Sequence, residues 1–215
     1  IERFLGDKAI EEGWKVEVTA PPSGKRVLVV GAGPSGLSAA YHLRRYGHRV
    51  TVREAGPMAG GMMRFGIPKY RLPRETLDAE IARIEDMGVI FDFNSKVEDV
   101  EAVAKGYDAV FLAVGAHIGK RAHIPAAESA KIMDAVSLLE DVELDEKPML
   151  GRRVVIYGGG NTAIDAARTA KRLGAEEAVI LYRRTRDRMP AHDSEVREAE
   201  EEGIMMRWLS TIKHV

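Results

Sequence analysis

Short apolar runs alternate along the chain with longer stretches in which apolar residues recur every three or four positions. The first pattern is typical of buried strands, and the second of helices that bury one face. Strands are expected at 26–30, 48–53, 89–93, 109–113, 154–157, 178–182 and 204–208. Helices are expected within 1–20, before Gly47, at 74–87, 97–104, 133–140 and 161–173, and after a cap at Asp193 or Ser194. This rhythm predicts an α/β fold with parallel sheets and right-handed crossovers.

Glycine-rich turns follow two of the expected strands and open two of the expected helices. A dinucleotide pyrophosphate needs backbone N–H donors at the positive end of a helix, and glycine gives it access. Gly31 would form the tight turn, Gly33 would let the backbone approach the phosphates, and Gly36 would let the helix pack closely. The second turn would repeat these roles at Gly158, Gly160 and Ala163. The alternative is an ordinary strand-to-helix turn, but the strand–turn–helix setting predicts two Rossmann-like βαβ units.

The two units differ at the end of their second strand. In the first unit the second strand ends at Glu54, roughly twenty residues after the turn. A carboxylate at this position can accept hydrogen bonds from a ribose. The second unit has no acid there and carries Arg183, Arg184 and Arg188. Guanidinium groups match a phosphate in charge and geometry, so this site is expected to prefer NADPH to NADH. The alternative is that the acid and the arginines are solvated strand-end charges.

The segment 56–73 is too long for a simple connection. Loops of this size are usually functional or disordered, and its glycines and methionines are not typical of disorder. Bare backbone at Gly61 beside the apolar Met62 suits a flat aromatic ring, and Arg71 follows where it could reach a phosphate or a flavin. The alternative interpretation is a methionine-rich packing loop.

Composition narrows the class of protein. The net charge of −1 gives no electrostatic case for nucleic acid or an anionic membrane. No apolar run is long enough to span a bilayer, and the first residues do not open a secretory signal, so a cytoplasmic protein is expected. The 215 residues contain no cysteine, which excludes a dithiol or a cysteine-ligated cluster on them. The six histidines show no metal-ligand spacing, and no metal site is expected.

Several motifs together resemble the FAD- and NADPH-binding part of the glutamate synthase small-subunit family. This family includes the flavin half of dihydropyrimidine dehydrogenase and electron-bifurcating ferredoxin:NADP oxidoreductases. The matching segments span the chain and are Ile1–Asp7, Gly31–Leu37, Gly66–Pro73, Ala113–Ala116, Gly158–Ala163 and Tyr182–Arg184.

The resemblance implies a set of binding residues for each cofactor. FAD would be held by Gly31, Gly33, Pro34, Ser35, Gly36, Glu54, Gly61, Met62, Arg71 and Gly115, with Val97 near the adenine. NADPH would be held by Gly158, Gly160, Asn161, Thr162, Arg183, Arg184 and Arg188. Hydride would pass from the nicotinamide to the flavin, so no catalytic side chain is expected.

The resemblance also implies a domain plan and partners. Residues 1–24 would form an N-terminal segment and linker, 25–150 an FAD domain that lacks its C-terminal return, and 151–215 a partial NADPH domain. Iron–sulfur clusters are expected outside this sequence or on a partner, either a large glutamate synthase-type subunit or a ferredoxin-type acceptor. Three functions stay open: a glutamate synthase small subunit, the NADP-linked subunit of a bifurcating or ferredoxin-linked complex, and a non-catalytic dinucleotide-binding scaffold.

Overall fold

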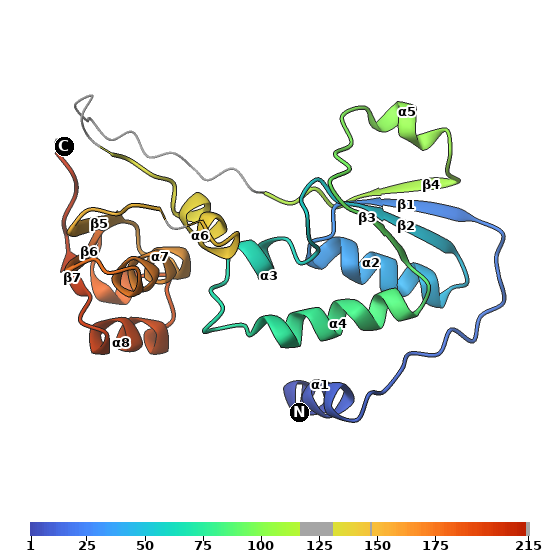
Figure 1. Cartoon of the computed structure of the whole chain (residues 1–215). Helices are drawn as coiled ribbons and strands as arrows, with labels where there is room; N and C mark the ends of the chain where they lie inside the picture. Colours follow the sequence, from blue (N-terminus) through green and yellow to red (C-terminus); the bar gives the residue numbers. More distant parts are fainter. Residues whose placement is uncertain (117–130, 147, 214–215) are drawn as a thin grey trace. The chain divides into compact units, whose positions relative to one another are not determined.

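The computed structural model describes residues 1–116, 131–146 and 148–213 (Figure 1). The described chain divides into two compact units. The first consists of Ile1–Arg64 and Lys69–Ala116, and the second of Phe65–Pro68 and the described residues after 116. Each unit is built around its own parallel sheet, which confirms the expected α/β class.

The first unit contains four parallel strands in the order β3-β2-β1-β4. Their bounds are β1 (Arg26–Val30), β2 (Arg49–Arg53), β3 (Ile90–Asp92) and β4 (Ala109–Leu112). β1 is central and buried from Val27 to Val30, as its unbroken apolar run predicts for a strand covered on both faces. β4 lies at an edge, and Leu112 is 56% exposed.

Helices connect these strands and complete the core. Their bounds are α1 (Glu2–Glu11), α2 (Pro34–Arg45), α3 (Met62–Phe65), α4 (Arg74–Asp86) and α5 (Val100–Ala104). α2 and α4 pack together and lie on the same face of the sheet (Figure 1). The core between helix and sheet includes Val29 and Val52 from the strands and Leu37 and Ala40 from α2.

The second unit contains three parallel strands in the order β5-β6-β7. The strands are β5 (Arg153–Tyr157), β6 (Glu177–Tyr182) and β7 (Met205–Trp208), and the helices are α6 (Ala135–Glu143), α7 (Asn161–Arg172), the 3₁₀ turn η1 (Arg186–Arg188) and α8 (Asp193–Glu201). α7 packs on the sheet and contacts both α6 and α8. The apolar core joins Ile156 and Ile180 of the sheet to Ile164 of α7 and Val196 of α8.

A buried ion-pair cluster also joins α7 to α8. The guanidinium of Arg168, only 5% exposed, lies 2.8 Å from Glu198, 2.7 Å from Glu202 and 3.4 Å from Glu195. Arg172 also contacts Glu202, at 2.7 Å. Burial raises the pKa of Glu202, but the hydrogen bonds from the two arginines outweigh it and hold the pKa below its usual value.

The expected elements are present, with bounds that differ by at most three residues, and two details differ. The predicted N-cap of α8 is wrong, because the N-cap residue is His192 rather than Asp193 or Ser194. The side chain of His192 makes no capping hydrogen bond. The backbone N–H of His192 donates to Asn161 Oδ1 at 3.1 Å, and α8 begins at Asp193, one or two residues earlier than expected. The expected loop 56–73 also contains the short helix α3.

Candidate dinucleotide-binding sites

The glycine-rich turn after β1 leaves no space for a side chain at two of its glycines. Gly31 has φ +103°, and a Cβ there would lie 2.3 Å from the carbonyl oxygen of Ala113. A Cβ on Gly36 would lie 1.9 Å from the carbonyl oxygen of Gly31. Both contacts are far inside van der Waals distance, so the fold itself requires glycine at these positions.

Gly33 differs because the space beside it is open. It is the N-cap residue of α2 in an extended conformation, and the nearest atom to an added Cβ is Gly61 Cα at 3.8 Å. Within residues 1–116, 131–146 and 148–213, the N–H groups of Gly33, Ser35 and Gly36 donate no hydrogen bond. The start of α2 therefore presents free donors around open space, with Pro34 at the first helical turn, and this arrangement fits a phosphate group.

Glu54 lies directly after β2 and holds the loops around this turn. Its Oε2 accepts a hydrogen bond from Ala32 N at 2.7 Å, and its Oε1 accepts one from Gly56 N at 2.9 Å. A carboxylate has about four acceptor positions, so both oxygens keep capacity for a further donor such as a ribose hydroxyl. The carbonyl of Glu54 also accepts from Ser95 N at 2.8 Å, which brings the segment before the half-buried Val97 beside the acid.

The 56–73 loop lies against the first turn. Gly60 N donates to Ala32 O at 2.9 Å, and Gly61, with φ +51°, is so close that an added Cβ would be 2.7 Å from Gly33 Cα. Met62, half-buried, follows as the first residue of α3. The structure therefore brings Gly61 and Met62 to the same turn as Gly33, as expected if the loop belongs to the site.

A buried arginine that the sequence analysis did not single out anchors this loop. Arg64 donates from Nε to Ala59 O at 2.6 Å and forms an ion pair with Asp78. Its own carbonyl accepts from Arg74 Nη2 at 2.6 Å. No motif marks Arg64, because an arginine in a loop is most often solvated and its burial here depends on tertiary packing.

Two further residues predicted for the first site are Gly115 and Arg71. Gly115, with φ +69°, is exposed two residues after Ala113, whose N–H donates to Val30 O at 2.8 Å. This pairing brings the segment after β4 beside the first turn. Arg71 is half-buried in the segment before α4.

The turn after β5 is also open at its helix start. A Cβ on Gly160, the N-cap residue of α7, would meet no atom within 4 Å. In the described parts of the chain, the N–H groups of Gly160, Asn161 and Thr162 have no hydrogen-bond acceptor. Gly158 is tied to β6 through its N–H, which donates to Leu181 O at 3.1 Å. This turn therefore offers a second set of free donors at the positive end of a helix.

The tip of β6 is basic, in contrast to the acidic tip of β2. Arg183 and Arg184 are exposed and make no ion pair with any residue that the structure describes. Arg186 lies 3.5 Å from Glu200, and Arg188, 74% exposed, lies 3.5 Å from its neighbour Asp187. Two cations at the strand end are thus available to an anionic ligand, and a third is only weakly paired.

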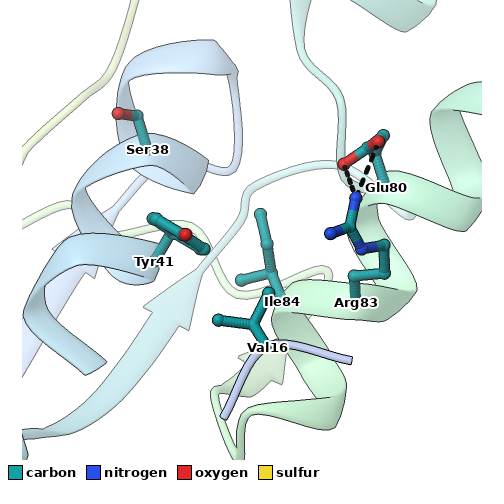
Figure 2. A pocket seen from close by; sticks show the side chains of 6 residues that line it. All are labelled: Val16, Ser38, Tyr41, Glu80, Arg83 and Ile84. Carbon is teal, nitrogen blue, oxygen red and sulfur yellow. Dashed lines mark hydrogen bonds and ion pairs between the residues drawn. The ribbon is translucent and has the colours of Figure 1, made fainter. Parts of the chain in front are cut away.

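A separate hollow in the first unit shares no residue with these sites. Figure 2 shows its lining by Val16, Ser38, Tyr41, Glu80, Arg83 and Ile84. Arg83 Nη1 donates to both carboxylate oxygens of Glu80, at 3.1 and 3.2 Å, and its buried Nε has no hydrogen-bond partner among the described residues.

Neither a metal site nor a membrane span is found in the residues described. No group of three histidine or acidic side chains there is placed to hold a metal ion. Every helix over the same residues is too short or too polar to cross a bilayer.

Comparison with known proteins assigns the family. A family model described as pyridine nucleotide-disulphide oxidoreductase matches residues 25–215. The chain belongs to the pyridine nucleotide-disulphide oxidoreductase family. The resemblance drawn from the motifs is confirmed at this level, and proteins of the pyridine nucleotide-disulphide oxidoreductase family bind FAD and NADPH.

Similar proteins within the pyridine nucleotide-disulphide oxidoreductase family include subunits of larger enzymes. The chain is 46% identical over 199 residues to the beta subunit of NADP(+)-dependent formate dehydrogenase from Moorella thermoacetica, covering 90% of this chain and 28% of that one. It is 39% identical over 223 residues to a putative glutamate synthase [NADPH] small chain from Cereibacter sphaeroides, covering 98% and 54%. The chain thus spans between about a quarter and about half the length of these relatives.

Solved structures share the fold. FprA from Mycobacterium tuberculosis in complex with NADPH superposes with a TM-score of 0.70 at 24% identity, over 82% of this chain and 47% of that chain. A histamine dehydrogenase from Rhizobium superposes with a TM-score of 0.66 at 22% identity, over 91% and 32%. At these identities the likeness concerns the fold alone.

Proposed function

We propose that this chain is the cofactor-binding part of an NADPH-dependent flavoprotein oxidoreductase, with FAD on the first unit and NADPH on the second. The observation that carries the proposal is the pair of open glycine-rich turns, one with an acidic strand tip and one with a basic tip. When bound, the two cofactors supply hydride transfer from nicotinamide to flavin. The residues of the chain supply binding, orientation and charge.

In the first site the backbone of the turn would hold the FAD pyrophosphate, and Glu54 would accept from the ribose. The free N–H groups at Gly33, Ser35 and Gly36 and the open space at Gly33 support this assignment. Gly61, Met62, Arg71, Val97 and Gly115 would complete the site along the flavin and adenine. This site belongs to the proposed domain 25–150.

In the second site the N–H groups of Gly160, Asn161 and Thr162 would hold the NADPH pyrophosphate. A carboxylate at the strand tip would repel a 2′-phosphate, whereas Arg183 and Arg184 can form charge-assisted hydrogen bonds with it. Arg188 would be a third contact, and Gly158 would shape the turn. This site belongs to the proposed domain 151–215.

Replacing both arginines, Arg183→Ala with Arg184→Ala, should weaken NADPH binding far more than NADH binding. A hydrogen bond to a charged group contributes about 1.5–3 kcal/mol, so the loss of NADPH affinity should exceed the loss of NADH affinity at least about tenfold. Titration of the purified variant with each nucleotide measures the ratio. Arg197→Ala with Arg207→Ala removes the same charge from exposed positions and serves as the control. Equal weakening of both nucleotides would exclude the 2′-phosphate role.

The electrons would leave the flavin for an acceptor outside these 215 residues, because they contain no cysteine that could form a dithiol. A partner that carries iron–sulfur clusters is the proposed acceptor, either a large glutamate synthase-type subunit or a ferredoxin-type protein. The motifs favour a glutamate synthase small subunit. The 46% identity to the formate dehydrogenase beta subunit, against 39% for the glutamate synthase small chain, supports the second candidate, the NADP-linked subunit of another redox complex.

Anaerobic reduction of the purified protein tests the proposed activity. After incubation with FAD and removal of free FAD by gel filtration, the protein should be yellow, and stoichiometric NADPH should bleach the absorption of its flavin in the absence of oxygen. NADH at the same concentration should act more slowly, because it lacks the 2′-phosphate. A protein that leaves gel filtration colourless after incubation with excess FAD would instead be a dinucleotide-binding scaffold, and the proposed function would be wrong.

A further inference from the structure

The middle glycine of the second turn, Gly159, makes room for a side chain of the protein rather than for a phosphate. A Cβ on Gly159 would lie 2.4 Å from two ring carbons of Tyr182, the last residue of β6. The same ring lies edge-on to Trp208 of β7, with centroids 6.5 Å apart at 87°. The Tyr182 ring is therefore held in one orientation between the turn and the neighbouring strand.

The hydroxyl of Tyr182 forms a hydrogen bond with the arginine-rich loop 183–188 that follows β6. Its Oη donates to the carbonyl of Arg188 at 2.7 Å, which closes the loop 183–188 back onto the end of β6. Tyr182 is only 9% exposed, so this hydrogen bond is shielded from competing water.

The far end of the same segment is attached to the glycine-rich turn itself. Ala191 N donates to Gly159 O at 3.1 Å, and His192 N donates to Asn161 Oδ1 at 3.1 Å. The segment 183–192 is therefore fastened at both ends, at the tip of β6 and beside the start of α7. Its arginines are held at a defined position relative to the free donors of Gly160 and Thr162.

We infer that Tyr182 is a positioning residue for NADPH selectivity, acting through the backbone of the arginine loop rather than by touching the nucleotide. This inference rests on the proposed NADPH site. With the loop fixed in advance, NADPH does not have to order it on binding, so less conformational entropy is lost when the nucleotide binds. NADH makes no contact through a 2′-phosphate, so its affinity does not depend on the loop.

Tyr182→Phe tests this role because it removes the hydroxyl and keeps the ring that packs on Gly159. We expect NADPH affinity to fall about three- to tenfold, the range given by the loss of one hydrogen bond, with NADH affinity unchanged. Tyr157→Phe is the matched control. It removes a tyrosine hydroxyl from the same sheet, one that is 3.1 Å from Thr211 Oγ1 and outside the arginine loop.

Limited digestion with trypsin gives a second readout that does not need a nucleotide. Cleavage after the arginines of the loop should be faster in Tyr182→Phe than in wild type or in Tyr157→Phe. Gly159→Ala should have the same two effects, because its Cβ displaces the Tyr182 ring. The melting temperature of each variant separates these effects from general unfolding.

The outcomes distinguish the inference from the function on which it rests. A Tyr182→Phe protein with the wild-type ratio of NADPH to NADH affinity and the wild-type cleavage rate would overturn the positioning role and leave the NADPH site intact. Wild-type protein that binds neither nucleotide would overturn the proposed function. In that case the cleavage rates alone would still decide whether the hydroxyl fixes the loop.

Discussion

Gly33→Val is expected to abolish FAD retention while the chain stays folded. The valine side chain would enter the open space at the start of α2, where its nearest neighbour is Gly61 Cα at 3.8 Å. It would block access to at least two amide donors, each contributing about 1.5–3 kcal/mol to a charged group, so FAD affinity should fall at least about 100-fold. Flavin content after gel filtration and titration with FAD measure the loss.

The second turn provides a reciprocal control for this substitution. Gly160→Val also places its side chain in open space, so it should remove NADPH binding and spare FAD. Gly36→Val differs, because its Cβ would collide with Gly31 O, and it should prevent folding of the turn itself. If the Gly33→Val protein is folded and keeps its flavin, the first turn does not hold the pyrophosphate.

Arg168→Ala is expected to lower the free energy of unfolding more than alanine substitution of Arg172, the other arginine of α7. Removing one partner of a fully buried ion pair costs about 3–5 kcal/mol. The acids around Arg168 are 14–51% exposed and water can solvate them in part, so the loss here should lie below that range. Alanine is an excellent helix former, so the effect would come from the lost charge contacts with Glu195, Glu198 and Glu202 rather than from helix propensity. Urea unfolding followed by circular dichroism gives the change in the free energy of unfolding.

Arg172→Ala and the pH dependence separate this cluster from a general helix effect. Arg172 is 48% exposed and contacts Glu202 from the surface, so its loss should cost much less than the loss of the buried Arg168. The folded pKa of Glu202 is lowered, so its contribution is present above its usual pKa of 4.5 and is lost as the pH falls through the folded value. The difference between wild type and Arg168→Ala should therefore narrow at acid pH, and a difference that is constant with pH would contradict the cluster's role.

The sheets and both turns could be predicted from the sequence because their signals are local. β1 is a run of apolar residues that ends at a glycine, and its bounds agree with the expectation of 26–30. The strand–turn–helix order also fixes parallel pairing, since the intervening helix must cross over the sheet. The open space at Gly33 and Gly160 follows from the roles that the glycine spacing assigned to them.

Contacts between distant segments could not be predicted in this way. The middle glycine of the second turn, Gly159, has no role in the expected motif, and its reason appears only when β6 brings Tyr182 onto it. Arg168 reads as an ordinary surface cation of an amphipathic helix, and only the docking of α8 surrounds it with acids. The short helix α3 inside the loop 56–73 was not predicted, because the contacts of Arg64 with Ala59, Arg74 and Asp78 depend on tertiary packing that no local pattern marks.

The engagement of Glu54 with two backbone amides bears on how the cofactor site assembles. Because Ala32 N and Gly56 N both donate to one carboxylate, the spacing of the two loops is set by contacts within the chain itself. Capture of the flavin would then be limited by diffusion and orientation rather than by a slow rearrangement of the polypeptide. Removing the Glu54 side chain should therefore slow the binding of FAD.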